Sequence, residues 1–431
     1  MDKKQTTKYV LTALKKAGAS MSECRITDTV KTELYYETGK IGLMRTNFNT
    51  VLSIKAIKDM RKGTVSLNSV KIEDIDRAVC SIMTAIESAT PDEAEGISDI
   101  IEDKSFQTGI SEPDKEAMYD SLTDYINQVR VKYPKISFNS ITIEHDYADT
   151  LYVNTNGVSL SAKRGLYSFS PMFMACDGDK SSSFNYSGME FLKFNKPLLN
   201  MGMNERLISE SEKQIDTKVL DGKFTGDIII TPNCLDGVLY DIESNFLSDS
   251  VLINGTSLFK NSLGKQVAAP IVTIMSCPEE KELPGGSFIT HDGYIAKNMP
   301  IIENGIFKNF VLSRYGAKKT GNKRSVSAGG NYIVNAGDTS LDEMIKGVKK
   351  GLLLNRFSGG APGANGDITG VAKNSFLIED GKITDALSEV MISGNLASLL
   401  MDVKAISKER INNGDSILPW MKVGNFVISG K

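Results

Sequence analysis

The sequence predicts an α+β fold: N-terminal α+β units with antiparallel sheets, followed by a larger strand-rich C-terminal domain. Alternating stretches rich in β-branched residues recur along the chain, and glycine-containing pairs divide them into hairpins. Amphipathic helices stand between groups of strands and do not follow every strand. Since 431 residues are too many for one comfortable core, we expect units at 1–110, 111–221 and 222–431.

The first unit is predicted from one alternating region and two helices. A short helix spans 8–17, and residues 27–67 alternate, with turn signals at Thr38-Gly39 and Lys62-Gly63. A stripe of Ile and Val between 72 and 86 then predicts a helix of about four turns over the strands. The polar, acidic stretch 90–115 indicates a linker or wrapping loop.

The second unit begins with a helix predicted over 116–133. Strands follow, and Asn156-Gly157 marks a hairpin because both residues accept a positive φ. A further helix over 205–219 is expected to end this unit.

The third unit is predicted to open with a buried strand, 226–232, and the amphipathic helix "GVLYDIESNFLSDS", 237–250. Its apolar residues are Leu239, Ile242, Phe246 and Leu247, and its other face is rich in carboxylates. Two hairpins follow, with turns at Asn304-Gly305 and Asp380-Gly381. A helix over 339–351 is bounded by a capping box at Ser340 and Glu343 and by a stop at Gly351.

Composition argues against several classes of function. The net charge of −3 argues against nucleic-acid binding, and the apolar runs are too short to span a membrane. The N-terminus has no apolar segment of the secretory kind, and the five scattered cysteines suit a reducing compartment. We therefore expect a cytoplasmic protein.

Motifs for catalysis or cofactor binding are nearly absent from the sequence. His145 is most simply structural, and His291 falls in a turn where a role in binding stays open. Cys234 has no histidine in its sequence context, although folding can still pair it with His291. The glycine-rich stretch 358–370 lacks the GK[ST] ending of a phosphate loop, and the basic stretch 316–325 is expected to be a solvated loop.

Five ordered segments resemble the TldD/PmbA family, once labelled modulators of DNA gyrase and regarded as peptide-processing metalloproteases. They are "GTSLFKNSLGKQV", "IIENGIFKNFVLSRYGAKKTG", "GANGDITGVAKNSFLIEDGKI", "MISGNLASLLMDV" and "ILPWMKVGNFVISG". The resemblance covers the whole chain and is strongest after Asp221. It implies an α+β N-terminal portion, a larger strand-rich C-terminal portion and a dimer.

The resemblance also implies where a metal motif would fall. The TldD branch carries HExxxH on the helix that opens the third region, with a cysteine ligand near the C-terminus. Reading back without gaps from Gly255, the motif positions fall on Tyr240, Asp241 and Asn245, and the segment before "ILPWMK" has no cysteine. Tyr and Asn are poor zinc ligands, so no metal, cofactor-binding or catalytic residue is assigned to this chain.

The chain therefore looks like the PmbA branch, also called TldE. The resemblance implies a subunit that assembles with a TldD-type partner, which carries the zinc, to process or degrade unfolded peptides. Two alternatives stay open. One is a homodimeric peptide-binding or scaffold protein without protease activity, and the other is an enzyme with relocated chemistry around Asp241, Cys234 and His291.

Overall fold

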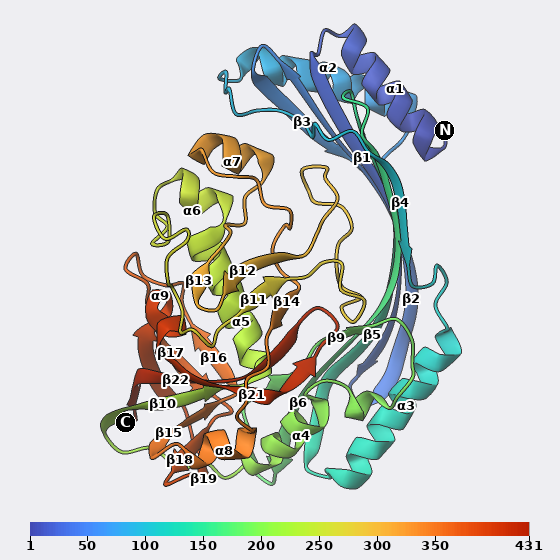
Figure 1. Cartoon of the computed structure of the whole chain (residues 1–431). Helices are drawn as coiled ribbons and strands as arrows, with labels where there is room; N and C mark the ends of the chain where they lie inside the picture. The colour runs from blue at the N-terminus through green and yellow to red at the C-terminus, as the bar shows by residue number, and fades with distance from the viewer. Residues whose placement is uncertain (431) are drawn as a thin grey trace.

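A computed structural model describes residues 1–430 and confirms the α+β class. Its strands form two mixed sheets (Figure 1). The N-terminal sheet has the order β3-β2-β1-β5-β6-β4 and forms a long curved wall along one side of the molecule. Its strands are β1 (Met21–Glu37), β2 (Lys40–Lys58), β3 (Arg61–Leu67), β4 (Asp103–Thr108), β5 (Ile136–Asn154), β6 (Ser159–Asp177), β7 (Lys180–Ser181), β8 (Asn185–Tyr186) and β9 (Met189–Phe191).

The units predicted at 1–110 and 111–221 contribute strands to this one sheet. β1 pairs antiparallel with β5 along almost its whole length, from Glu23 opposite Asn154 to Glu37 opposite Ser140. The strands β1, β2, β5 and β6 are 17 to 19 residues long, which is far beyond the usual length of about five or six. This length lets one sheet carry helices at both of its ends.

Helices cover the two ends of the N-terminal sheet. α1 (Lys3–Lys16) and α2 (Ile72–Ser88) lie at one end, and α3 (Lys115–Lys132) and α4 (Asn204–Lys213) lie toward the other (Figure 1). The predicted stripe of α3 is confirmed, because its apolar residues are all buried; they are Met118, Leu122, Tyr125, Ile126 and Val129. α4 ends six residues before the predicted end at 219.

Two N-terminal predictions are wrong. β2 and β3 are joined at Asp59 and Met60, which both have positive φ, and not at Lys62-Gly63. Gly63 lies inside β3, where a Cβ would come within 2.5 Å of the Ile82 carbonyl oxygen, so its absence allows α2 to approach the sheet. The predicted linker 90–115 also contains β4, which pairs in parallel with β6. β4 is an edge strand, a position that suits its polar residues.

The C-terminal sheet follows the order β13-β12-β11-β14-β22-β10-β15-β18-β19. The predicted buried strand is confirmed as β10 (Lys223–Ile230), whose last three isoleucines are buried. The other strands are β11 (Ile274–Ser276), β12 (Met299–Glu303), β13 (Ile306–Phe307), β14 (Tyr332–Val334), β15 (Lys350–Leu354), β16 (Arg356–Gly359), β17 (Asp367–Lys373), β18 (Phe376–Glu379), β19 (Lys382–Ala386), β20 (Val390–Asn395), β21 (Val403–Asn412) and β22 (Ile417–Ser429).

Both predicted C-terminal hairpins are confirmed, with positive φ at each turn residue; these are Asn304, Gly305, Asp380 and Gly381. The capping box of α8 (Leu341–Lys346) is also confirmed. The predicted stop at Gly351 is wrong, since the helix ends before Gly347 and Gly351 belongs to β15. There a Cβ would lie 2.1 Å from the carbonyl oxygen of Asp227 on the neighbouring strand.

The remaining helices are α5 (Pro232–Ile242), α6 (Asp249–Ile253), α7 (Arg314–Thr320) and α9 (Leu396–Leu399), and α5 lies among the C-terminal strands (Figure 1). One apolar cluster joins the two parts of the chain, since Ile229 and Trp420 from the C-terminal sheet pack with Tyr167 and Leu207. Among residues 1–430, no helix is both long and apolar enough to cross a membrane.

Candidate functional site

The helix predicted over 237–250 begins earlier and changes its winding. α5 starts at Pro232, where proline suits the first helical position, and ends at Ile242. The chain continues as a π-helical turn, Glu243–Leu247, before α6. The apolar residues Leu239, Ile242, Phe246 and Leu247 are all buried, so the predicted apolar face is confirmed. π turns are rare and frequently mark functional sites.

Glu243 holds this π turn against the sheet. Its carboxylate accepts hydrogen bonds from the backbone N–H of Gly330 at 3.1 Å and from the hydroxyl of Tyr332 on β14. Burial raises the pKa of Glu243, and the two hydrogen bonds offset part of that rise. The predicted polar face is therefore not uniformly solvated, because one of its carboxylates is a structural anchor.

The three predicted motif positions lie on α5 and the π turn. The side chain of Tyr240 is 68% exposed. Asp241 is half-buried and faces a cavity, and burial raises the pKa of its carboxyl group. Asn245 donates its amide N–H to the carbonyl oxygen of Asp241 at 2.8 Å and to the hydroxyl of Ser244 at 3.2 Å.

The π turn bears on the spacing of this motif. Its first and last positions are five residues apart, which in a regular α-helix places them about 140° apart around the axis. A π turn bonds residue i to residue i+5, so it brings such positions toward one side of the helix. In the part of the chain that the structure describes, no three His, Cys, Asp or Glu side chains gather in a way that could hold a metal ion.

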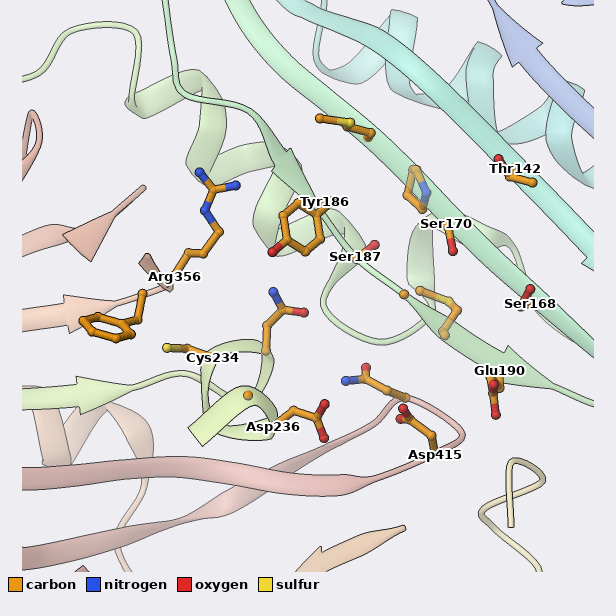
Figure 2. Close-up of a pocket in the computed structure, with 18 of the residues that line it drawn as sticks. Thr142, Ser168, Ser170, Tyr186, Ser187, Glu190, Cys234, Asp236, Arg356 and Asp415 are labelled. Carbon is orange, nitrogen blue, oxygen red and sulfur yellow. The ribbon is translucent and has the colours of Figure 1, made fainter. Parts of the chain in front are cut away.

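A cavity of about 730 Å³ lies between the N-terminal sheet and α5 (Figure 2). The sheet contributes a row of small hydroxyl side chains, namely Ser140, Thr142, Ser168 and Ser170. Tyr186 on β8, Glu190 on β9 and Arg356 on β16 line it from the strands, and Asp236 and Asp241 line it from α5. Asn413 and Asp415 come from the turn between β21 and β22.

The carboxylates of this cavity have no salt bridge within residues 1–430. Burial raises the pKa values of Glu190 and Asp236, and the charge of Asp415 raises both further. Arg164 partly offsets the rise at Glu190, but its guanidinium donates to the carbonyl oxygens of Gly285 and Gly286. The cavity therefore holds negative charge that the chain does not neutralise by direct contact.

Arg356 is the only Lys or Arg among the described residues that line this cavity. Its guanidinium lies 5.5 Å from the centre of the Tyr186 ring, a cation–π arrangement. Its Nε is buried without a hydrogen-bond partner within residues 1–430. Because Nε is itself inaccessible, a ligand acceptor in the cavity would bind the terminal N–H groups of this guanidinium.

The residues considered for relocated chemistry are not all brought together. Cys234 and Asp241 line the same cavity, whereas His291 lines a separate one of about 330 Å³. Burial raises the pKa of the Cys234 thiol to about 12, which disfavours the thiolate that nucleophilic attack requires. His145 is buried against the ring of Tyr167, and burial lowers its pKa, as expected for a structural histidine.

Two other predicted segments lie away from this cavity. The basic stretch 316–325 is not a solvated loop, since its first half belongs to α7 and Lys319 forms a salt bridge with Asp92 at 2.8 Å. Arg324 bonds Asp292 and lies 3.6 Å from the centre of the Tyr294 ring. Burial alone would raise the pKa of Asp292, but Arg324 lowers it to about 2. The glycine-rich stretch 358–370 joins β16 to β17 and leads into no helix.

Sequence reasoning did not find Glu190, Asp236, Arg356 or Asp415. These residues come from four segments far apart in the chain, and none belongs to a recognisable short motif. The nearest signal for Asp415 was "ILPWMK", because Asp415 lies two residues before its first residue, Ile417, in the short segment of the turn.

Comparisons with known proteins agree with the fold. A model of the PmbA/TldA metallopeptidase C-terminal domain matches residues 223–430. Metalloprotease PmbA of Escherichia coli O157:H7 is 21% identical over 96% of this chain and 95% of its own length. A zinc metalloprotease TldD homolog of Saccharolobus solfataricus is 25% identical over 68% of this chain and 69% of its own.

The structural comparison extends over both sheets. TldE from Thermococcus kodakarensis has a TM-score of 0.84 with this chain at 19% identity, covering 99% of this chain and 100% of TldE. The matching domain and these relatives show that this chain belongs to the PmbA/TldD family, and the structural neighbour has the same fold.

Proposed function

We propose that this chain is the non-catalytic, PmbA/TldE-type subunit of a two-chain zinc metalloprotease that processes or degrades unfolded peptides. The proposal is carried by the side chains at the three motif positions. Tyr240 and Asn245 are poor zinc ligands, and the amide of Asn245 is already bonded to the helix backbone. In this proposal a TldD-type partner supplies the zinc, the activated water and the general base.

The cavity beside α5 supports a role in holding the peptide. β8, β9 and β16 are short strands that border it, and β8 and β9 each pair with β6 while β16 pairs with β17. The outer edge of β16 offers backbone N–H and C=O groups to an extended chain of almost any sequence, whereas the Glu190 N–H of β9 and the Tyr186 N–H of β8 already donate to Asn413 and Asn185. The hydroxyl row from the sheet adds further hydrogen-bonding groups along the same space.

The edge of β2 supports association with a second chain of the same fold. β3 pairs with β2 only from Leu52 to Lys58, so among the described strands none covers residues 40–51 on that side. This stretch exposes apolar side chains, namely Leu43, Met44, Phe48 and Val51. A long apolar edge is unfavourable in water unless another strand covers it. A TldD-type subunit of similar fold would offer a matching strand.

We place this complex in the cytoplasm. All five cysteines are free in the structure, and Cys80 is exposed, which suits a reducing compartment.

Co-purification from the source organism tests the proposal. A tagged copy of this chain is expected to bring down an HExxxH-bearing relative, and the pair is expected to cleave an unfolded peptide that neither chain cleaves alone. Recovery of this chain only with itself would instead favour a homodimeric peptide-binding protein. Stoichiometric zinc and peptide cleavage by the isolated chain would rule the proposal out.

A further inference from the structure

The charges in the cavity beside α5 are separated in space. Figure 2 shows Arg356 and Tyr186 on one side of it, with Glu190 and Asp415 on the other. Asp236 on α5 lies between the two groups, nearer to Asp415. The cavity thus has its one cation at one end and the close carboxylates Glu190 and Asp415 at the other, with Asp236 and Asp241 along α5.

The anionic end is held in place by the backbone. The N–H of Glu190 donates to the carbonyl oxygen of Asn413 at 2.7 Å. The N–H of Gly285 donates to the carbonyl oxygen of Gly414 at 3.1 Å. A Cβ built on Gly285 would lie 2.1 Å from Glu190 Oε2 and 3.3 Å from the Cα of Asp415. Glu190 and Asp415 are therefore close neighbours that meet beside a glycine.

This pair of carboxylates is unfavourable in the unliganded chain. Like charges at close range and partial burial both disfavour ionisation, and no Lys or Arg in residues 1–430 forms a salt bridge with either group. A ligand cation placed between them would offset the repulsion and favour the ionised form of both groups. An ammonium or a guanidinium group of a ligand can serve as this cation.

The cationic end of the cavity is suited to an anionic group of the ligand. The Arg356 guanidinium stacks on Tyr186, and its Nε has no acceptor in the described chain. Guanidinium groups bind carboxylates through paired N–H donors, so a carboxylate is the matching ligand. The hydroxyl row of the sheet connects the two ends and suits a peptide backbone.

We infer that this cavity binds an extended peptide in one direction, with a cationic group against Glu190 and Asp415 and a carboxylate against Arg356. The cation is a Lys or Arg side chain or a free α-amino group, and the carboxylate is the C-terminus of the peptide. This inference rests on the proposed function, since it names the substrate class of the same cavity.

Direct binding to the isolated chain tests the inference without zinc or a partner. The probes are dye-labelled, unstructured Gly/Ser/Ala peptides with an acetylated N-terminus, a free C-terminus and one Lys near the N-terminal end. Fluorescence anisotropy is expected to give a dissociation constant about tenfold lower for the Lys peptide than for its Gln counterpart. Moving the Lys next to the C-terminal carboxylate is expected to abolish this advantage. The Gln peptide with a free N-terminus shows whether an α-amino group serves equally.

Variants test which residues bind the cationic group of the peptide and which bind its carboxylate. Glu190→Gln with Asp415→Asn is expected to reduce the Lys preference to about twofold or less, and Arg356→Met to abolish the preference for a free carboxylate over an amide. Glu87→Gln and Arg77→Met, on the exposed face of α2, are the matched controls and are expected to change neither preference.

Equal binding of the Lys and Gln peptides by the unaltered chain would overturn the inference, whatever the variants do. So would a Lys preference that persists in a folded Glu190→Gln, Asp415→Asn chain. Because these measurements omit the partner, they leave the proposed function standing if they fail. Failure of co-purification, in turn, leaves them unaffected.

Discussion

At the scale of single residues, the cavity carries carboxyl groups that reduce stability at neutral pH. Burial raises the pKa of Glu190 above its ordinary value of 4.5, and the charge of Asp415 adds to the rise. The folded chain therefore holds this proton more tightly than the unfolded chain does. The resulting contribution to stability is fully present below pH 4.5 and is lost as the pH rises through the pKa of the folded state.

Glu190→Gln is expected to stabilise the chain at pH 7 and not at pH 4. The substitution keeps the shape of the side chain and removes the charge, so the melting temperature should rise by about 1–3 °C at pH 7. Thermal denaturation at both pH values measures this difference. Glu87→Gln on the surface of α2 should change neither value. A lower melting temperature for Glu190→Gln at pH 7 would show that the carboxylate is already stabilised within the chain.

At the scale of elements, the π turn after α5 is the feature that periodicity did not predict. The apolar spacing of 237–250 is compatible with one continuous helix, so it predicted the buried face and missed the change of winding. The bonds from Gly330 and Tyr332 to Glu243 are long-range contacts that no local pattern encodes. Such a turn suits a motif whose ligands are five residues apart.

Tyr240→His combined with Asn245→His tests whether the π turn brings positions 240 and 245 to one side of the helix. If the turn brings the two positions to one side, the double variant should bind Zn²⁺ about tenfold more tightly than either single variant. Competition with a chromogenic chelator measures the affinities. Equal affinities for the double and single variants would show that the two positions face apart.

The free edge of β2 leads to a second prediction at this scale. Phe48 is 78% exposed on the uncovered stretch, so Phe48→Asp should weaken association with the TldD-type partner by about tenfold or more. Analytical ultracentrifugation of the mixed chains measures this. Val131→Asp on α3 is the matched control, since Val131 is 85% exposed on another face. If both variants associate normally, the partner does not use this edge.

Local patterns predicted most elements and failed where a long-range contact decides the outcome. The stripe of α3 and the positive-φ hairpin turns depend on neighbouring residues alone, and the structure confirms them. Gly63 and Gly351 look like turn or stop signals, yet each is a glycine because another backbone passes close by. The partner atoms belong to Ile82 and Asp227, which are far away in the sequence.

At the scale of the whole molecule, the candidate site exists only because the two sheets meet. The N-terminal sheet provides the hydroxyl row and Glu190, while the C-terminal part provides α5, Arg356 and Asp415. Sequence reasoning located one wall of this cavity, the helix α5, and of the motif positions Tyr240, Asp241 and Asn245 only Asp241 lines the cavity. It could not locate the opposite wall, because the pairing of β6 with β9 and the packing of the two sheets are tertiary properties.

This arrangement suits a division of labour between two chains of similar fold. The chain described here offers a charged cavity of about 730 Å³ beside a helix whose motif positions hold poor metal ligands. In the proposed complex it positions the peptide, and the partner carries out metal-assisted hydrolysis. In this arrangement the zinc belongs to the partner and not to the chain described here.

The zinc content of the complex, measured by mass spectrometry after the two subunits are separated under native conditions, tests that claim most directly. We predict about one zinc per TldD-type subunit and essentially none in the chain described here. Replacing the first histidine of the partner's HExxxH should remove the zinc, while Asp241→Asn in this chain should leave it in place. Zinc that stays with this chain, or that is lost with Asp241→Asn alone, would contradict the account.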